Sequence, residues 1–328
     1  SGTFASVVMA SPFRRRTVSH HCHSMSSQQT SRRNYRYDPS TRQARDMAKS
    51  LPFTPQRIVV GLAAFAWVVL AIVAPWQSYG DSHSTAFAVV LAVWGWLCWT
   101  SVFIGFLVPS PITLTITRCI TPLAVVISLV ATAPLAIFAS IVVFIICSSA
   151  LFVDAFVQGG AYGDEKRFSL RTPVPHMAPA ALVWALLCGS LIGGSLFTAA
   201  QNYIAGAPLL VAGIVLVRIV PKRLHRLARR WLVLVPAGLV VHDHMVLAET
   251  HMTSKNGIMS LRVVTENGEA ADFTGGVLGL RLSVEMKEAD KVVLSKITAK
   301  TLGTTEALHV KTFVIAPRRI HVAMAALS

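Results

Sequence analysis

The densest group of potential metal-binding side chains lies in the C-terminal third of the chain. The group consists of His242, Asp243, His244, Glu249 and His251. Alternate residues of a strand point to the same face, so a strand here would place His242 beside His244, and two imidazoles with a carboxylate suit zinc. Histidines one residue apart are also common by chance, and the spacing fixes no further ligand. The sequence therefore predicts no metal site, with zinc at His242 and His244 as the alternative.

Other classes of chemical site are not represented in the sequence. It contains no nucleophile elbow, no P-loop, no H-E-x-x-H pair and no dinucleotide-binding glycine motif. The cysteines are widely spaced without a C-x-x-C pair, which predicts neither a disulfide framework nor a zinc centre; they are Cys22, Cys98, Cys119, Cys147 and Cys188. We therefore expect no catalytic residue and no cofactor, and an enzyme is disfavoured.

One acidic residue lies inside a long apolar run. Asp154 is the only charged residue of segment 120–157. A carboxylate at membrane depth is costly unless it meets a partner or water, which makes an intramembrane acid a candidate for an ion or proton pathway. Its position about one turn from the end of the run favours a contact at the interface instead. There Asp154 would either reach the interface itself or pair with Arg118 or Lys166.

The apolar runs are long enough to cross a membrane. Of the 328 residues, 53% are hydrophobic and only 14% are charged, against about 25% charged in an average soluble domain. An α-helix of about 20 apolar residues crosses a hydrocarbon core of about 30 Å. We therefore predict an α-helical membrane bundle of about six transmembrane helices, over 58–76, 85–108, a segment ending near 132, 135–157, 178–200 and 203–220.

Two of these spans carry small residues four positions apart. Ser101 and Gly105 form such a pair in the second span, and Gly189 and Gly193 form one in the fifth. Small residues at this spacing let helices approach closely. We expect both pairs to serve packing within the bundle, with dimerisation as the alternative.

Positive charge is concentrated on one side of the predicted spans. The net charge is +15, and residues 1–57 alone hold ten Lys or Arg and two Asp. This arm has too little apolar area to fold, so we expect a disordered basic segment. Its His20-His21-Cys22-His23 tract is interpreted as incidental, with metal binding as the alternative. The loops on the side of the arm carry Lys or Arg and the opposite loops carry none, which predicts a cell-membrane protein with both termini in the cytoplasm.

A basic segment follows the last predicted span directly. Residues 221–230 form a linker with five cations, which are Lys222, Arg223, Arg226, Arg229 and Arg230. A short amphipathic helix of this charge would bind anionic lipid headgroups at the membrane surface. A solvated flank that only fixes the orientation of the span is the alternative. Neither basic segment has the aromatic interleaving of a nucleic-acid-binding module, so we expect no nucleic-acid partner.

Residues 231–328 have the composition of a small soluble domain, with ten Lys or Arg and nine Asp or Glu. Alternating apolar residues predict strands at 231–235, 239–241, 260–264, 278–286, 291–294 and 308–316, and a closing helix at 318–327. Turn-forming residues at 236–238, 266–268 and 274–276 separate the strands. The fold class expected is therefore a membrane bundle followed by a small β-rich (α+β) cytoplasmic domain.

The order of segments at this boundary resembles that of known membrane-attached modules. A strand, the turn Pro236-Ala237-Gly238, a second strand at 239–243 and the apolar segments 246–250 and 258–261 come directly after a membrane hairpin and a basic linker. This arrangement resembles the bacterial pleckstrin-homology-like modules, although six spans precede it here instead of the usual two or four. The whole chain is similar to uncharacterised actinobacterial multi-pass membrane proteins. The resemblance implies a role in binding or assembly and not a reaction.

Two classes of function remain open from the sequence. We expect a non-enzymatic assembly or regulatory component of the lipid bilayer, whose cytoplasmic domain binds a protein partner or an anionic lipid headgroup. The alternative is a small transporter or channel that uses Asp154 and proline-broken helices, with Pro122, Pro134 and Pro208 in or near spans. No inverted repeat is visible in the six spans, which argues against the transporter.

Overall fold

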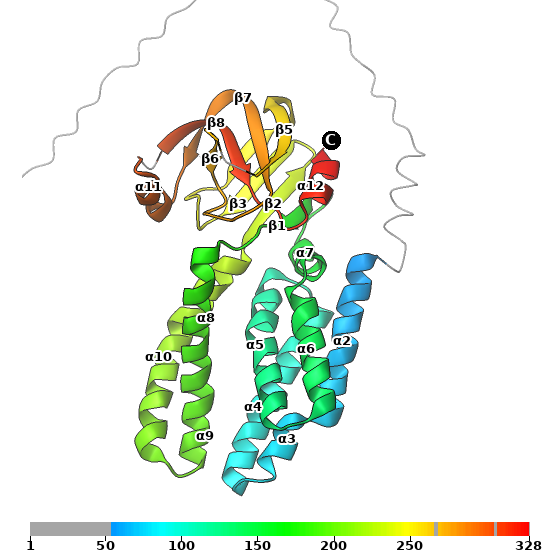
Figure 1. Ribbon diagram of the computed structural model, residues 1–328, viewed down its shortest axis with the longest axis vertical. Helices are drawn as coiled ribbons and strands as arrows, with labels where there is room; N and C mark the ends of the chain where they lie inside the picture. Colours follow the sequence, from blue (N-terminus) through cyan, green and yellow to red (C-terminus); the bar gives the residue numbers. More distant parts are fainter. Residues whose placement is uncertain (1–53, 266–267, 305–306, 328) are drawn as a thin grey trace, which may run out of the picture. The chain divides into compact units, whose positions relative to one another are not determined.

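The computed structural model describes residues 54–265, 268–304 and 307–327. Nearly all of the predicted basic arm, with the tract His20-His21-Cys22-His23, lies outside these residues. Within them, apolar helices come first and a β-rich region follows, as the composition predicts (Figure 1). The fold therefore has the two kinds of segment expected from the sequence.

The helical part contains nine α-helices and one π-helical turn within the described residues. They are α2 (Pro55–Val73), α3 (Pro75–Gly80), α4 (Thr85–Leu107), α5 (Pro111–Val130), α6 (Pro134–Ser148), α7 (Ala150–Gln158), α8 (Val174–Cys188), the π-helical turn Gly189–Gly193, α9 (Gly194–Ala199) and α10 (Tyr203–Ala228). Five helical segments are long and apolar enough to cross a membrane, or six if the bent pair α6 and α7 counts as one span.

The predicted span over 135–157 is not one straight helix. Helices α6 and α7 meet at an angle of 63°. The break occurs at Ser149, whose backbone is extended and whose hydroxyl accepts a hydrogen bond from the amide of Phe152 at the start of α7. A serine in this conformation ends one helix and caps the next. The prediction of a continuous fourth span is therefore corrected to a 15-residue helix followed by a short bent one.

Close packing of the helices uses other glycines than those predicted. A Cβ added at Gly206 of α10 would lie 2.4 Å from Thr198 Oγ1, and one added at Gly213 would lie 2.9 Å from Leu191 Cα. These two glycines let α10 approach the preceding helix, from which it is separated by a tight turn. A Cβ at Gly189 or at Gly193 would meet no atom of the described residues within 4 Å. The predicted packing of that pair within the bundle is therefore wrong.

The other predicted pair lies on α4. Gly105 is buried, and a Cβ there would lie 3.1 Å from the hydroxyl of Thr117 on α5. The Ser101 hydroxyl instead donates to the carbonyl of Leu97 in its own helix, at 2.7 Å. Of this pair, the glycine is the residue placed at a helix contact.

The β-rich region consists of two four-stranded sheets. Its elements are β1 (Lys166–Ser169), β2 (Arg230–Val235), β3 (Gly238–Asp243), β4 (His251–Ser254), β5 (Ile258–Val264), β6 (Ala271–Asp272), β7 (Arg281–Val293), α11 (Lys296–Leu302), β8 (Ala307–Ile315) and α12 (Ile320–Leu327). The strand orders are β1-β2-β3-β4 and β5-β7-β8-β6. Segments predicted as two strands, 278–286 and 291–294, form the single strand β7, whose pairing with β8 is interrupted between Glu285 and Asp290.

Strand β1 comes from the connection between α7 and α8, and not from the C-terminal part of the chain. It pairs antiparallel with β2, with Lys166 opposite Leu234 and Ser169 opposite Trp231. The β-rich region thus includes residues 166–169 in addition to the predicted domain 231–328. Because this strand is tethered at both ends to helices, the sheet is joined to the helical part at two separate places in the sequence.

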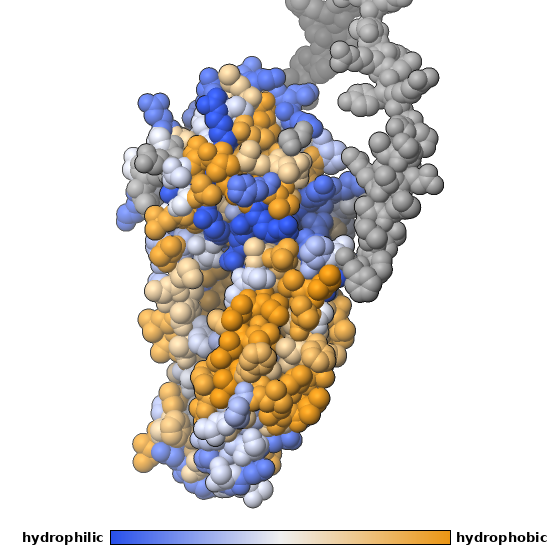
Figure 2. All heavy atoms as spheres, turned by 45° about the vertical axis from the view of Figure 1, so that its right-hand side comes forward, coloured by the Kyte–Doolittle hydropathy of each residue, from blue (hydrophilic) through white to orange (hydrophobic). Residues whose placement is uncertain are grey.

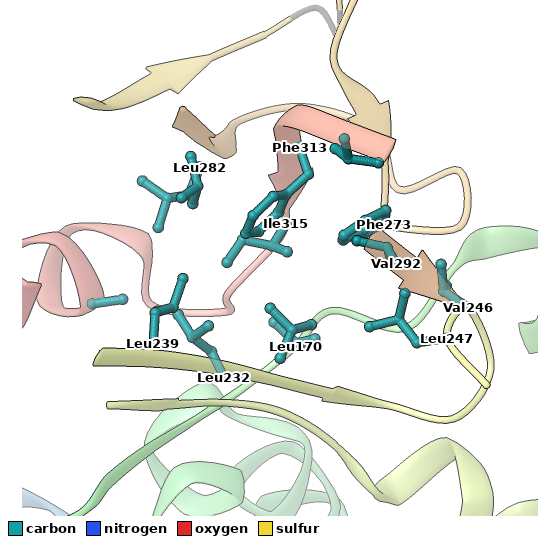
Figure 3. Close-up of a cluster of buried hydrophobic side chains, with 14 of the residues drawn as sticks. Leu170, Leu232, Leu239, Val246, Leu247, Phe273, Leu282, Val292, Phe313 and Ile315 are labelled. Carbon is teal, nitrogen blue, oxygen red and sulfur yellow. The ribbon is translucent and has the colours of Figure 1, made fainter. Parts of the chain in front are cut away.

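The two sheets enclose a common apolar core (Figure 3). Leu232 and Leu239 reach it from the β1-β2-β3-β4 sheet, Leu170 reaches it from directly after β1, and Leu282 and Phe313 reach it from the other sheet. Phe313 also stacks on Phe273, with ring centroids 5.0 Å apart. Since β2 residues 232 and 234 point into this core, the alternation along the strand turns residues 231 and 233 to the opposite face of the sheet.

Hydropathy divides the surface along the molecule (Figure 2). Apolar atoms cover the helices, while hydrophilic atoms gather on the β-rich region and at the opposite end of the helices. Exposed apolar side chains such as Phe65, Ile72 and Phe138 belong to this surface. A soluble protein does not expose a continuous apolar surface of this extent, whereas a membrane protein does.

Candidate functional site

The outer face of the β1-β2-β3-β4 sheet lies against the helices. Trp231 pairs with His242, and Val233 pairs with Val240. Trp231 and Val233 are buried in a cluster with apolar residues of the bundle, among them Phe152. The sheet is therefore covered on both faces, by its partner sheet and by the helices.

A cavity of about 540 Å³ opens at this junction. It is open to the surface and is lined by the start of α5, the connection from α7 to β1, the end of α10, and the outer face of β2 and β3. The lining residues are Ser110, Pro111, Ile112, Gly160, Tyr162, Arg167, His225, Arg229, Trp231, Val233, Val240 and His242. Its volume is in the range of roughly 300–1,000 Å³ that is typical of small-molecule sites.

The polar groups of the lining are those that bind anions. Two guanidinium groups and two imidazoles, from Arg167, Arg229, His225 and His242, belong to the lining, and no Asp or Glu does. Helix α5 also begins at the cavity, where the Ser110 hydroxyl accepts from the amide of Thr113. Both arginine side chains and the start of a helix attract negative charge.

Arg167 is held in place by its neighbours. Its Nη2 donates to Glu165 Oε1 at 2.6 Å, and its guanidinium carbon lies 5.6 Å from the centre of the Trp231 ring. The amide of Arg167 donates to Gln158 Oε1 at the end of α7. Glu165 neutralises part of the charge of Arg167, so Arg229 is the arginine of the lining that forms no ion pair with a described residue.

His242 is a partly buried histidine of the cavity lining that lies near several positive charges. Its ring stacks on Trp231 with centroids 4.8 Å apart, and Nδ1 lies 3.2 Å from Thr250 Oγ1. Burial, together with the smaller effects of the positive charges of His244, Arg229 and Arg167, lowers the pKa of His242 to about 4, against the opposing effect of Asp243. His242 is therefore neutral in the folded protein at neutral pH.

This pKa predicts a loss of stability in acid. Between about pH 6.5, where an unfolded histidine takes up a proton, and about pH 4, the unfolded chain binds one proton more than the folded chain at His242. Stability therefore falls as the pH falls through this window. Thermal unfolding of the full chain in detergent, followed from pH 7.5 to pH 4, should show a shallower decrease for His242→Gln than for wild type. His244→Gln, a substitution of the exposed neighbouring histidine, is the control. An equally shallow decrease in stability for His244→Gln would contradict the assignment of this pH dependence to His242.

The predicted metal ligands do not converge. The rings of His242 and His244 lie 4.4 Å apart, but Asp243 turns to Arg230 and His251 is buried near Phe273. No group of three His, Cys, Asp or Glu side chains that could hold a metal occurs in the part of the chain that the structure describes. His242 stacks on Trp231 and His251 lies against Phe273, whereas His244 is exposed.

The five predicted lipid-binding cations separate into three groups. Lys222, Arg223 and Arg226 are exposed on α10, which continues without interruption to Ala228. Arg229 lines the cavity. Arg230 is 2% exposed, and its Nε and Nη2 donate to Asp243 Oδ2 at 2.9 and 2.7 Å. Arg230 was therefore wrongly assigned to the membrane surface, because it forms a buried ion pair within the β-rich region.

Asp154 meets other partners than those predicted. It is 2% exposed, and its Oδ1 accepts from the amide and the hydroxyl of Ser169, at 2.9 and 2.6 Å. Arg319, directly before α12, places Nη1 3.8 Å from Oδ2. The prediction of Arg118 or Lys166 as partner is therefore wrong. Asp154 connects α7 to the first strand and to the C-terminal helix of the β-rich region.

The residues that line the cavity are distant in the sequence and were not predicted to lie together. Arg167 and Arg229 belong to two basic segments that the charge pattern places on the same side of the spans, and this was the available signal. Ser110, His225 and Trp231 carried no comparable signal, because their approach depends on the pairing of β1 with β2 and on the packing of α10 against α5. His225 Nδ1 lies 2.9 Å from Thr115 Oγ1 of α5.

Comparison with known proteins finds no matching family model, no matching curated protein and no matching solved structure.

Proposed function

We propose that this protein is a multi-pass membrane component that binds an anionic phospholipid headgroup in the cavity between its helices and its sheet. The proposal includes six spans, a location in the cell membrane and both termini in the cytoplasm. It also includes a non-enzymatic assembly or regulatory role and a β-rich region related to the pleckstrin-homology-like modules. The observation that carries it is the cavity lining, in which arginines and histidines face an apolar wall.

The position of the cavity favours a lipid over a soluble anion. It is bounded by the ends of α5 and α10, two of the helices long enough to cross a membrane. Headgroups of the adjacent leaflet lie at this level, and their phosphates are negatively charged. Trp231, Val233 and Val240 provide an apolar wall beside Arg229. A molecule with a phosphate at one end and an apolar portion at the other fits both parts of the lining.

Native mass spectrometry of the full chain in neutral detergent tests the proposal. The protein is titrated with dihexanoyl phosphatidylglycerol and, separately, with dihexanoyl phosphatidylcholine. Wild type should retain the anionic lipid preferentially. Arg229→Ala should weaken this binding about tenfold, because a hydrogen bond to a charged group contributes about 1.5–3 kcal/mol and 1.4 kcal/mol is a factor of ten.

Arg223→Ala is the matched control, since Arg223 is an exposed cation on the same helix and does not line the cavity. It should change the affinity less than twofold, in keeping with a screened surface charge. Equal losses for the two variants would indicate binding to the exposed basic surface of α10. Equal retention of the two lipids by wild type would refute recognition of an anionic headgroup.

A further inference from the structure

A glycine-rich loop exposes two leucines next to the helices. Residues 274–280 connect β6 to β7, and Gly275, Gly276 and Gly279 adopt φ angles of 72°, 89° and 84°. These left-handed conformations favour glycine. The side chains of Leu278 and Leu280 are 72% and 44% exposed, whereas Val277 between the glycines is buried. The loop is thus anchored by one apolar side chain and presents two others.

The start of α8 holds the loop in place. Arg171 Nη1 donates to the carbonyl of Leu278 at 3.0 Å, and its Nη2 donates to the carbonyl of Leu280. A Cβ added at Gly275 would lie 3.2 Å from the ring of Pro173, the residue directly before α8. These contacts place the loop at the level where α8 begins.

Apolar side chains are also exposed at the start of α8, close to the place where the loop contacts Pro173. In the first turn of α8, Val174 and Met177 are 55% and 57% exposed. This helix opens the segment Val174–Ala199, which is long and apolar enough to cross a membrane. The loop therefore lies beside the end of a segment that is long and apolar enough to cross a membrane.

We propose that residues 274–280 insert into the lipid leaflet from which α8 enters the bilayer. Burial of an exposed leucine side chain stabilises the inserted state, and side chains of this kind bind at the boundary of headgroups and acyl chains. Arg171 and Arg281 donate to carbonyls of the loop and so place positive charge beside the leucines, which is the sign of charge that attracts anionic headgroups. The partner of these leucines is lipid, because the loop contacts the residue directly before a helix long and apolar enough to cross a membrane. None of the loop residues lines the headgroup cavity, so the two proposals stand independently.

Photo-crosslinking of the full chain in its own membrane tests the insertion. The photoreactive residue p-benzoylphenylalanine replaces Leu278, and the irradiated protein is purified and weighed intact. The control position is Met259, which is 61% exposed on β5. Figure 1 shows this strand on the side of the β-rich region away from the helices. We expect adducts with the mass of a phospholipid at position 278 at a yield at least fivefold above that at position 259.

Three results would overturn the insertion. These are equal lipid yields at the two positions, no lipid adduct at position 278, and a crosslink from position 278 to another protein. Should replacement of Leu278 prevent accumulation of the protein in membranes, the same measurement at Leu280 decides between the outcomes. Binding of phosphatidylglycerol in the cavity is measured on the variants of Arg229 and Arg223. The crosslinking result and the lipid-binding result can therefore fail independently of each other.

Discussion

Arg230→Met, with Asp243 left in place, is expected to lower the free energy of unfolding by about 3–5 kcal/mol, because the buried carboxylate loses its countercharge. Arg230 donates two hydrogen bonds to Asp243, one to the carbonyl of Arg171 at 2.9 Å and one to that of Thr274 at 3.1 Å. It therefore connects β2 and β3 to the segment before α8 and to the loop after β6. Denaturant unfolding of the full chain in detergent, followed by tryptophan fluorescence, measures the change.

The double variant Arg230→Met with Asp243→Leu is the informative comparison. Replacing a whole buried ion pair by apolar side chains is often neutral or stabilising, so the double variant should recover most of the loss. Arg223→Met on the exposed surface of α10 serves as the control and should change stability by less than about 0.5 kcal/mol. A double variant as unstable as Arg230→Met would mean that the carbonyl partners, and not the charge of Asp243, account for the effect.

Asp154→Leu is expected to destabilise the connection between α7 and the β-rich region by about 3 kcal/mol. The amide and the hydroxyl of Ser169 would both lose their acceptor in a buried place, and each unsatisfied buried group costs about 1–3 kcal/mol. Arg319 would lose its neighbouring carboxylate as well. The measurement is thermal unfolding in detergent together with protease accessibility of the segment around Ser169.

Asp154→Asn separates this structural role from the alternative function of transport. The amide oxygen can still accept from Ser169, so the destabilisation should be well below that of Asp154→Leu. A proton pathway that depends on the carboxylate would instead be abolished by either substitution. Proton flux in proteoliposomes therefore distinguishes the two roles. Flux in wild type that is lost in a stably folded Asp154→Asn protein would favour transport over a structural contact.

The contacts of the C-terminal segment support the structural role. Arg318 donates from Nη1 to the carbonyl of Ser148 at the end of α6, at 3.4 Å, and from its amide to the carbonyl of Ser169. Arg319 approaches Asp154 one turn into α7. Both arginines thus contact the bend between α6 and α7 from the start of α12. The contacts of Asp154 with β1 and with the residue before α12 therefore explain its burial without a transported substrate.

Local patterns in the sequence were sufficient for the elements that depend on their own residues. Long apolar runs predicted the helices, and a short apolar run at 231–235 and the pattern at 308–316 predicted strands β2 and β8. Burial of one face or of a whole segment leaves a repeating signal in the sequence. The break at Ser149 was harder to predict from the sequence. Serines also occur inside continuous helices, and only the structure shows that the Ser149 hydroxyl caps α7.

The sequence by itself therefore determined that apolar helices precede a β-rich region, and that cations flank the helices mostly on one side. Only the tertiary structure decided that residues 166–169 complete the sheet, that Arg230 is buried against Asp243, and that Arg229 lines a cavity. The physical reason is that strand pairing, ion pairs and cavities join residues distant in sequence. Charge and hydrophobic periodicity indicate whether a residue prefers water or an apolar environment. Which distant residues it contacts depends on how the chain folds.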